Sequence, residues 1–244
     1  MDIKSFKNAF NVNKVLLGMI HLKGDTDAAI FNRAKKEIDM LIGGGFDAVI
    51  IEDYYSDELM VEKVLHYIYH HRPNIGYGVN VLVDYRLSFE FANKYHAKFI
   101  QIDSVAGHLN VKGDLLFAKS MEKYRAESNA LVLGGVRFKY QPILSGRSVE
   151  EDVKIGMSRC DAIVVTGEGT GMDTDLNKIK SFRKIMGDDF PLIIGAGLTP
   201  KNAKDKLVLA DGGIVGSCLK DNHRADGEIY PDYVHELVKA VRLI

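Results

Sequence analysis

The sequence predicts a single-domain (β/α)8 barrel that spans residues 1–244. Eight short β-branched runs recur along the chain, and each is followed by a longer stretch with helical periodicity. This alternation is typical of parallel βα units, and eight such units close a barrel of about 250 residues. An open doubly wound sheet is the alternative fold, because hydrophobic periodicity alone does not show closure.

The expected strands are apolar runs that end in polar residues or glycines. They are Val15–His21, Ala48–Asp53, Gly78–Asp84, Phe99–Asp103, Leu131–Lys139, Ala162–Gly167, Leu192–Gly197 and Gly213–Ser217. The expected helices are Asp27–Ile42, Asp57–His71, Leu87–Tyr95, Leu115–Ser128, Val149–Met157, Leu176–Met186, Lys201–Leu209 and Tyr233–Val241. Gly43, Pro73 and Gly187 stand where three of these helices must end.

Composition excludes several classes of protein. The chain is 46% hydrophobic and 27% charged with a net charge of −1, so it has no cationic surface of the kind that binds nucleic acid. No apolar run approaches the roughly 20 residues that a membrane span needs. The first residues lack an apolar signal segment, so we expect a cytoplasmic protein. Cys160 and Cys218 adjoin apolar strands and are expected to be buried, reduced thiols.

Polar residues at strand ends are the candidates for chemistry, because such barrels build their sites there. Glu52, Asp103 and Lys139 end three different predicted strands and are candidate acids and bases. Lys139 has two further interpretations, as a Schiff-base nucleophile or as a clamp for a developing oxyanion, and a structural ion pair with a carboxylate at the mouth is the alternative to all three. His21 closes the first strand and is a candidate base, hydrogen-bond donor or metal ligand.

The ends of the seventh and eighth strands predict a phosphate site. Gly195, Gly197 and Gly216 let the backbone come close to an anion. Backbone N–H groups there can then bind the anion without a cationic side chain. Ser217 adds a hydroxyl donor, and Lys220 adds a positive charge. Glycines that merely permit tight turns are the alternative interpretation.

Further contacts to a ligand are expected from Asn80, Arg137 and Thr166, which also lie at strand ends, and from the glycine-rich loop that follows the sixth strand. No compact metal motif is present, so no metal or other cofactor is expected. A divalent cation held by carboxylates at the mouth is kept as an alternative. Those carboxylates are Glu52, Asp53, Asp84 and Asp103.

Five segments of the chain resemble the BtpA family, also called the BtpA/SgcQ family. They are Gly18-Met19-Ile20-His21-Leu22, Ile51-Glu52-Asp53, Gly78-Val79-Asn80-Val81-Leu82, Val165-Thr166-Gly167 with Thr170-Gly171, and Ala210-Asp211-Gly212-Gly213-Ile214-Val215-Gly216-Ser217. The resemblance implies a barrel of the ribulose-phosphate-binding type and, through the family name, a role in photosystem I accumulation. This chain lacks the family's proline-rich segment after the first strand and has Glu52-Asp53 in place of Glu-Asn.

A local resemblance concerns phosphoribosylanthranilate isomerase, whose seventh strand ends in a run similar to Gly197-Leu198-Thr199-Pro200-Lys201-Asn202. That enzyme uses a cysteine base at the end of its first strand and an aspartate acid at the end of its sixth. This chain has His21 and Thr166-Gly167 in those places. The resemblance therefore implies a shared phosphate site without the same chemistry.

These features predict an enzyme that binds a phosphorylated small molecule. The expected substrate is a phosphorylated sugar or nucleoside derivative, and the expected reaction is isomerisation or the cleavage of a carbon–carbon or carbon–nitrogen bond. A non-catalytic assembly or stability factor that uses the barrel as a binding scaffold is the alternative. A homo-oligomer is compatible with either function.

Overall fold

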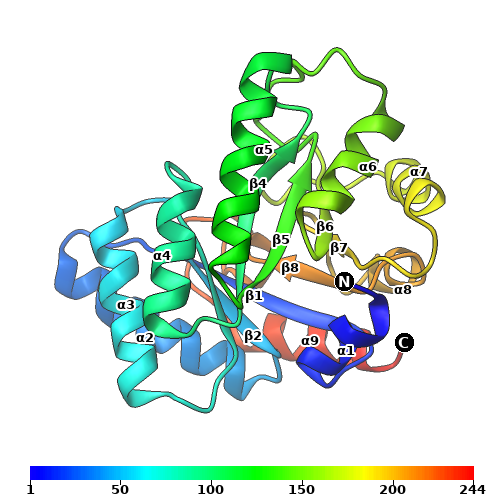
Figure 1. Cartoon of the computed structure of the whole chain (residues 1–244). Coiled ribbons are helices and arrows are strands. Elements are labelled where there is room, and N and C mark those ends of the chain that lie inside the picture. The colour runs from blue at the N-terminus through cyan, green and yellow to red at the C-terminus, as the bar shows by residue number, and fades with distance from the viewer.

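The computed structural model describes all 244 residues and is a closed barrel of eight parallel strands (Figure 1). Neighbouring strands pair in sequence order, and the last pairs with the first. This closure excludes the open sheet. The strands are β1 (Val15–His21), β2 (Ala48–Glu52), β3 (Tyr77–Asn80), β4 (Phe99–Ala106), β5 (Leu131–Val136), β6 (Ala162–Val165), β7 (Leu192–Ile194) and β8 (Gly212–Val215).

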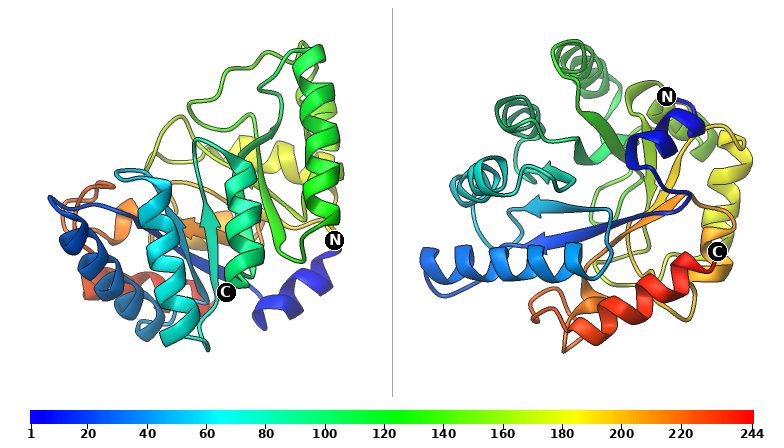
Figure 2. Two further views of the ribbon diagram at one scale, coloured as in Figure 1. Left: turned by 60° about the vertical axis from the view of Figure 1, so that its left-hand side comes forward. Right: turned by 90° about the horizontal axis from the view of Figure 1, so that it is seen from below.

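The helices surround the strands as an outer layer (Figure 2). They are α2 (Asp27–Gly43), α3 (Glu58–His71), α4 (Tyr85–Tyr95), α5 (Val111–Ala126), α6 (Val149–Arg159), α7 (Leu176–Met186), α8 (Ala203–Leu207) and α9 (Pro231–Arg242), with a 3₁₀ turn, η1 (Ser217–Leu219), after β8. Several begin at a side-chain cap; Asn110, for example, starts α5 four residues before the predicted boundary. None of the helices combines the length and apolar composition that crossing a bilayer requires.

One helix, α1 (Ile3–Phe10), is absent from the sequence prediction. Asp2 caps it by accepting a hydrogen bond from the backbone N–H of Ser5 at 2.7 Å. Phe6 and Phe10 lie on one face and join the apolar cluster inside the barrel, where the Phe10 ring meets Phe99 edge-on at 5.7 Å. The helix therefore covers the N-terminal end of the barrel, opposite the strand ends that carry the polar residues.

Side chains alternate between the inside of the barrel and its outer helical layer. Val15, Leu17 and Met19 of β1 belong to the interior cluster, whereas Leu16 and Ile20 pack against the helices. The same two-residue period continues to the C-terminal strand ends, where the next inward positions are polar. An apolar interior thus supports a polar layer at the mouth.

Apart from β1 and β4, all the observed strands end earlier than predicted, because their last predicted residues leave the sheet and enter the βα loops. Strand β4 instead runs three residues further, to Ala106, with an irregular register between Ile102 and Ala106. Gly135 of β5 makes this irregularity possible, since a Cβ there would overlap the carbonyl oxygen of Asp103.

Candidate active site

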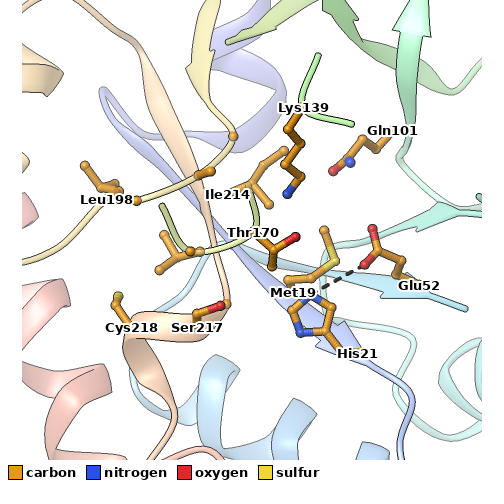
Figure 3. Close-up of a pocket in the computed structure, with 16 residues that line it drawn as sticks. Met19, His21, Glu52, Gln101, Lys139, Thr170, Leu198, Ile214, Ser217 and Cys218 are labelled. Atoms are coloured by element: carbon orange, nitrogen blue, oxygen red, sulfur yellow. Dashed lines mark ion pairs between the residues drawn. The ribbon is translucent and has the colours of Figure 1, made fainter. Parts of the chain in front are cut away.

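The largest group of predicted residues meets in one cavity at the C-terminal end of the barrel. The cavity encloses about 480 Å³, part of it open to solvent. Figure 3 shows His21, Glu52, Gln101 and Lys139 on one side, with Leu198, Ser217 and Cys218 on the other. The site therefore has a titratable end and an end formed by the loops after β7 and β8.

At the titratable end, Glu52 is almost completely buried. Its Oε1 accepts a hydrogen bond from Nδ2 of Asn80 at 2.9 Å, and its Oε2 lies 3.5 Å from Nε2 of His21. Burial, and secondarily the nearby carboxyl of Asp103, raises the pKa of Glu52 to about 8. Asp103 accepts hydrogen bonds from Asn80 at 3.2 Å and from Gln101 at 3.1 Å, and burial raises its pKa as well. Asn80 thus joins the two carboxyl groups, and Glu52 carries a proton at neutral pH.

His21 is neutral in this setting. Burial, followed by the charges of Lys220 and Lys139, lowers the pKa of His21 to about 3. Its Nδ1 makes no hydrogen bond although the side chain is buried, and the same holds for Oε1 of Gln101. Two buried polar atoms without a hydrogen bond next to one cavity are unusual in a folded protein.

Lys139 has a free ammonium group. The side chain is half-buried, and no carboxylate oxygen lies within 4.0 Å of Nζ, so the structural ion pair is not formed. The backbone N–H of Lys139 donates to Oγ1 of Thr166 at 2.9 Å, while the Thr166 carbonyl accepts from Lys178. Thr166 therefore holds the loop that carries Lys139, and its expected contact with the ligand is corrected to this supporting position outside the cavity.

The other end of the cavity presents backbone donors. The N–H groups of Ala196, Gly197, Leu198 and Gly216 make no hydrogen bond within the chain, and all four residues line the cavity. Ser217 adds a hydroxyl beside them at the start of η1. Unused N–H groups from two adjacent strand ends are the arrangement with which such barrels hold a phosphate group.

Gly195, Gly197 and Gly216 are glycines for a different reason from the one predicted from the sequence. Gly197 has φ +67°, and a Cβ there would overlap the backbone of Met172; one on Gly195 would overlap β6 side chains. A Cβ on Gly216 would come within 2.9 Å of Cε1 of His21. The glycines are thus required by close contacts within the protein, and the free N–H groups, not the missing side chains, are what the site offers to an anion.

The glycine-rich loop after β6 covers the cavity. Thr170 is held from two sides, because its N–H donates to the Tyr140 hydroxyl at 2.8 Å and its Oγ1 lies 3.3 Å from the Tyr54 hydroxyl. Gly171, with φ +74°, lies against Ser217. Neither tyrosine is among the site residues predicted from the sequence. Their positions directly after the Glu52-Asp53 and Lys139 strand ends were the available signal.

Two predicted cations lie outside the cavity. Lys220 is completely buried and pairs with Glu37 of α2 at 2.7 Å, so its predicted contribution to the phosphate site is corrected to an internal ion pair. Arg137 donates from Nε to Asp152 of α6 at 2.8 Å and lines a neighbouring cavity. Lys220 and Arg137 are thus each neutralised by a carboxylate of a helix. The pattern of the strands alone does not predict these partners.

The carboxylates considered for a cation are divided among local roles. Asp53 accepts the Leu82 N–H at 2.9 Å, and Asp84 caps α4 and pairs with Arg86 at 2.7 Å. No three of the histidine, cysteine, aspartate and glutamate side chains are placed together as metal ligands. Cys160 is buried, whereas Cys218 is half-buried and lines the cavity; burial raises the pKa of each thiol to about 12.

Residues 12–243 match the BtpA family. The chain belongs to the BtpA family. An uncharacterised protein of Methanocaldococcus jannaschii is 27% identical to this BtpA-family chain, covering 92% of it and 94% of the relative. The photosystem I biogenesis protein BtpA of Synechocystis is 24% identical, with 95% and 89% covered.

Solved barrels resemble this BtpA-family fold at low sequence identity. (S)-3-O-geranylgeranylglyceryl phosphate synthase of Thermoplasma acidophilum, in complex with sn-glycerol-1-phosphate, superposes with a TM-score of 0.64 at 14% identity over the whole of both chains. A phosphoribosyl anthranilate isomerase complex gives 0.58 at 13% identity, covering 95% of this chain and all of the other. These likenesses confirm the barrel fold.

Proposed function

We propose that this BtpA-family barrel is an enzyme that acts on a phosphorylated sugar or nucleoside derivative. The observation that carries the proposal is the cavity with two unlike ends. Residues with unused N–H groups after β7 and β8 line one end, and Lys139 with its free ammonium and Glu52 with its proton-bearing carboxyl line the other.

The two ends of the cavity have different roles in the proposed reaction. The N–H groups and Ser217 hold the phosphate, and this fixes the rest of the substrate against the titratable end. The Lys139 ammonium stabilises the negative charge that develops on a carbonyl or leaving-group oxygen, and Glu52, protonated at neutral pH, then donates its proton to that oxygen and becomes a carboxylate. A phosphate anchor, an acid and a cation directed at one oxygen suit an isomerisation or a bond cleavage next to a carbonyl.

The test of this proposal is a panel of phosphosugars and nucleotides measured by thermal shift. A ligand at about 100 times its Kd stabilises the protein by about 2.7 kcal/mol, a shift of about 5–11 °C for a domain of this size. Ser217→Asp should abolish the shift by charge repulsion, whereas Ser217→Asn, of similar size, should retain much of it. Turnover of the bound compound should vanish in Lys139→Met. If no phosphorylated compound shifts the melting temperature, the proposal fails.

The alternative, a non-catalytic scaffold, has one observation in its favour. Val111, Leu115 and Leu116 on α5 are more than half exposed, and a Synechocystis relative is named for photosystem I biogenesis. A scaffold would bind its partner through such a surface. Under this alternative, charged substitutions at Leu115 and Leu116 would abolish function in cells while Lys139→Met would have no effect.

A further inference from the structure

A second cavity adjoins the predicted phosphate site on its outer side. It shares Gly171, Ser217 and Cys218 with the main cavity, so these residues have both spaces beside them. The remaining walls come from the loop after β7, from the loop after η1 and from α9, which packs on both α8 and η1. They are Thr199, Pro200, Lys201, His223, Tyr233 and Glu236.

The chemistry of this outer cavity differs from that of the main one. The rings of His223 and Tyr233 are stacked, with centroids 4.9 Å apart and planes inclined by 25°. The backbone N–H of His223 donates to the Lys220 carbonyl at 3.0 Å, which ties the backbone at His223 to the segment that follows η1. Lys201 and Glu236 form no ion pair, so one ammonium and one carboxylate on the rim are free for a ligand.

The shared residues Gly171, Ser217 and Cys218 lie between the main cavity and the outer cavity. Their position determines what kind of phosphate compound occupies both cavities. A phosphate monoester has one organic substituent, which would fill only the main cavity and leave the outer one empty. A diphosphate diester has a second substituent, for which the outer cavity beside Ser217 and Cys218 is the adjoining space. A flat, hydrogen-bonding group is the one suited to a pair of stacked rings beside a carboxylate.

We propose that the outer cavity binds the nucleoside half of a nucleoside diphosphate derivative whose other half enters the main cavity. The base stacks on the exposed His223 ring, which Tyr233 supports from its other face. Glu236 accepts hydrogen bonds from amino or hydroxyl groups, and Lys201 neutralises the second phosphate. This inference rests on the proposed function, since it extends the same phosphate site. It specifies the substrate class as a nucleotide-linked compound and not a simple sugar phosphate.

Calorimetric titration with ribose 5-phosphate and ADP-ribose tests the inference, because the second compound contains the first and adds only the adenylate arm. ADP-ribose should bind the wild-type protein at least about tenfold more tightly, the gain expected from stacking one base. Tyr233→Ala should remove most of that difference without changing the affinity for ribose 5-phosphate. Glu236→Gln, at an exposed position where folding is not at risk, should reduce it several-fold.

Matched controls are available among residues that line neither cavity. Tyr69→Ala and Glu90→Gln replace the same residue types at exposed sites on α3 and α4, and neither should alter the binding of either compound. Equal affinities for the two compounds in the wild-type protein would overturn the nucleotide inference while leaving the phosphate site in place. A preference for ADP-ribose that survives in both Tyr233→Ala and Glu236→Gln would overturn it too. If neither these compounds nor any other phosphate ester binds, the proposed function fails together with it.

Discussion

Replacing Glu52 by glutamine should make the protein more stable at neutral pH while abolishing its activity. Oε1 of glutamine can accept the same hydrogen bond from Asn80 that Glu52 accepts at 2.9 Å, so the local packing is retained. What the substitution removes is a buried group that resists ionisation. A residue kept for chemistry at a cost in stability behaves in this way.

The size of the effect follows from the raised pKa. Burial, with the Asp103 carboxyl as a second cause, raises the pKa of Glu52 from 4.5 to about 8. The folded protein therefore retains a proton that the unfolded chain releases, and wild-type stability falls as pH rises from about 4.5 to about 8. At about 1.4 kcal/mol per pKa unit, raising the pH from about 5 to about 7.5 costs about 3 kcal/mol at this residue. Glu52→Gln does not incur that loss.

The assay is thermal unfolding of wild type and Glu52→Gln at both pH values. The stability of the variant relative to wild type should increase by about 3 kcal/mol from the lower to the higher pH, or about 6–12 °C in Tm. Glu90→Gln on the exposed surface of α4 should show no such pH-dependent difference. A variant that is less stable than wild type by the same amount at both pH values would show that Glu52 is an ionised structural group, and the reasoning about the titratable end would be wrong.

Three further outcomes are expected. Lys220→Met should destabilise the fold by about 3 kcal/mol in urea unfolding, because Glu37 stays buried and keeps only Arg33 as a partner; an unchanged midpoint would contradict the internal ion pair. Phe10→Ala should cost about 3 kcal/mol by opening the floor of the barrel, and loss of the whole of α1 should cost no less. The protein should fail to complement a strain that lacks phosphoribosylanthranilate isomerase, and growth of that strain would refute the reading of His21 and Thr166.

The barrel and the inward-facing part of the site could be predicted because both follow from short-range periodicity. His21 and Glu52 continue the alternation of their strands, so their convergence at the mouth follows once the strands are parallel and closed. The same reasoning places Gly195 and Gly216 at the same end of the barrel, just after β7 and β8.

The partners of the charged residues could not be predicted in that way. Lys220 is neutralised by Glu37, which lies 183 positions earlier in the chain, and Arg137 by a carboxylate of α6. Which helix side chain reaches into the barrel depends on helix packing and not on strand pattern. Helix α1 was missed for a related reason, since eight residues carry too little periodicity and only its contact with the interior of the barrel shows what it does.

The central claim is that backbone N–H groups after β7 and β8 bind phosphate, and amide NMR tests it most directly. Inorganic phosphate and a phosphosugar should each produce saturable shifts of the Gly197, Leu198 and Gly216 amide resonances, while Gly187, which ends α7 away from the site, stays unchanged. Each compound should give one Kd from all three signals. If these resonances stay fixed at saturating phosphate, or if the shifts appear only at exposed lysines and arginines, the phosphate site is not where the free N–H groups place it.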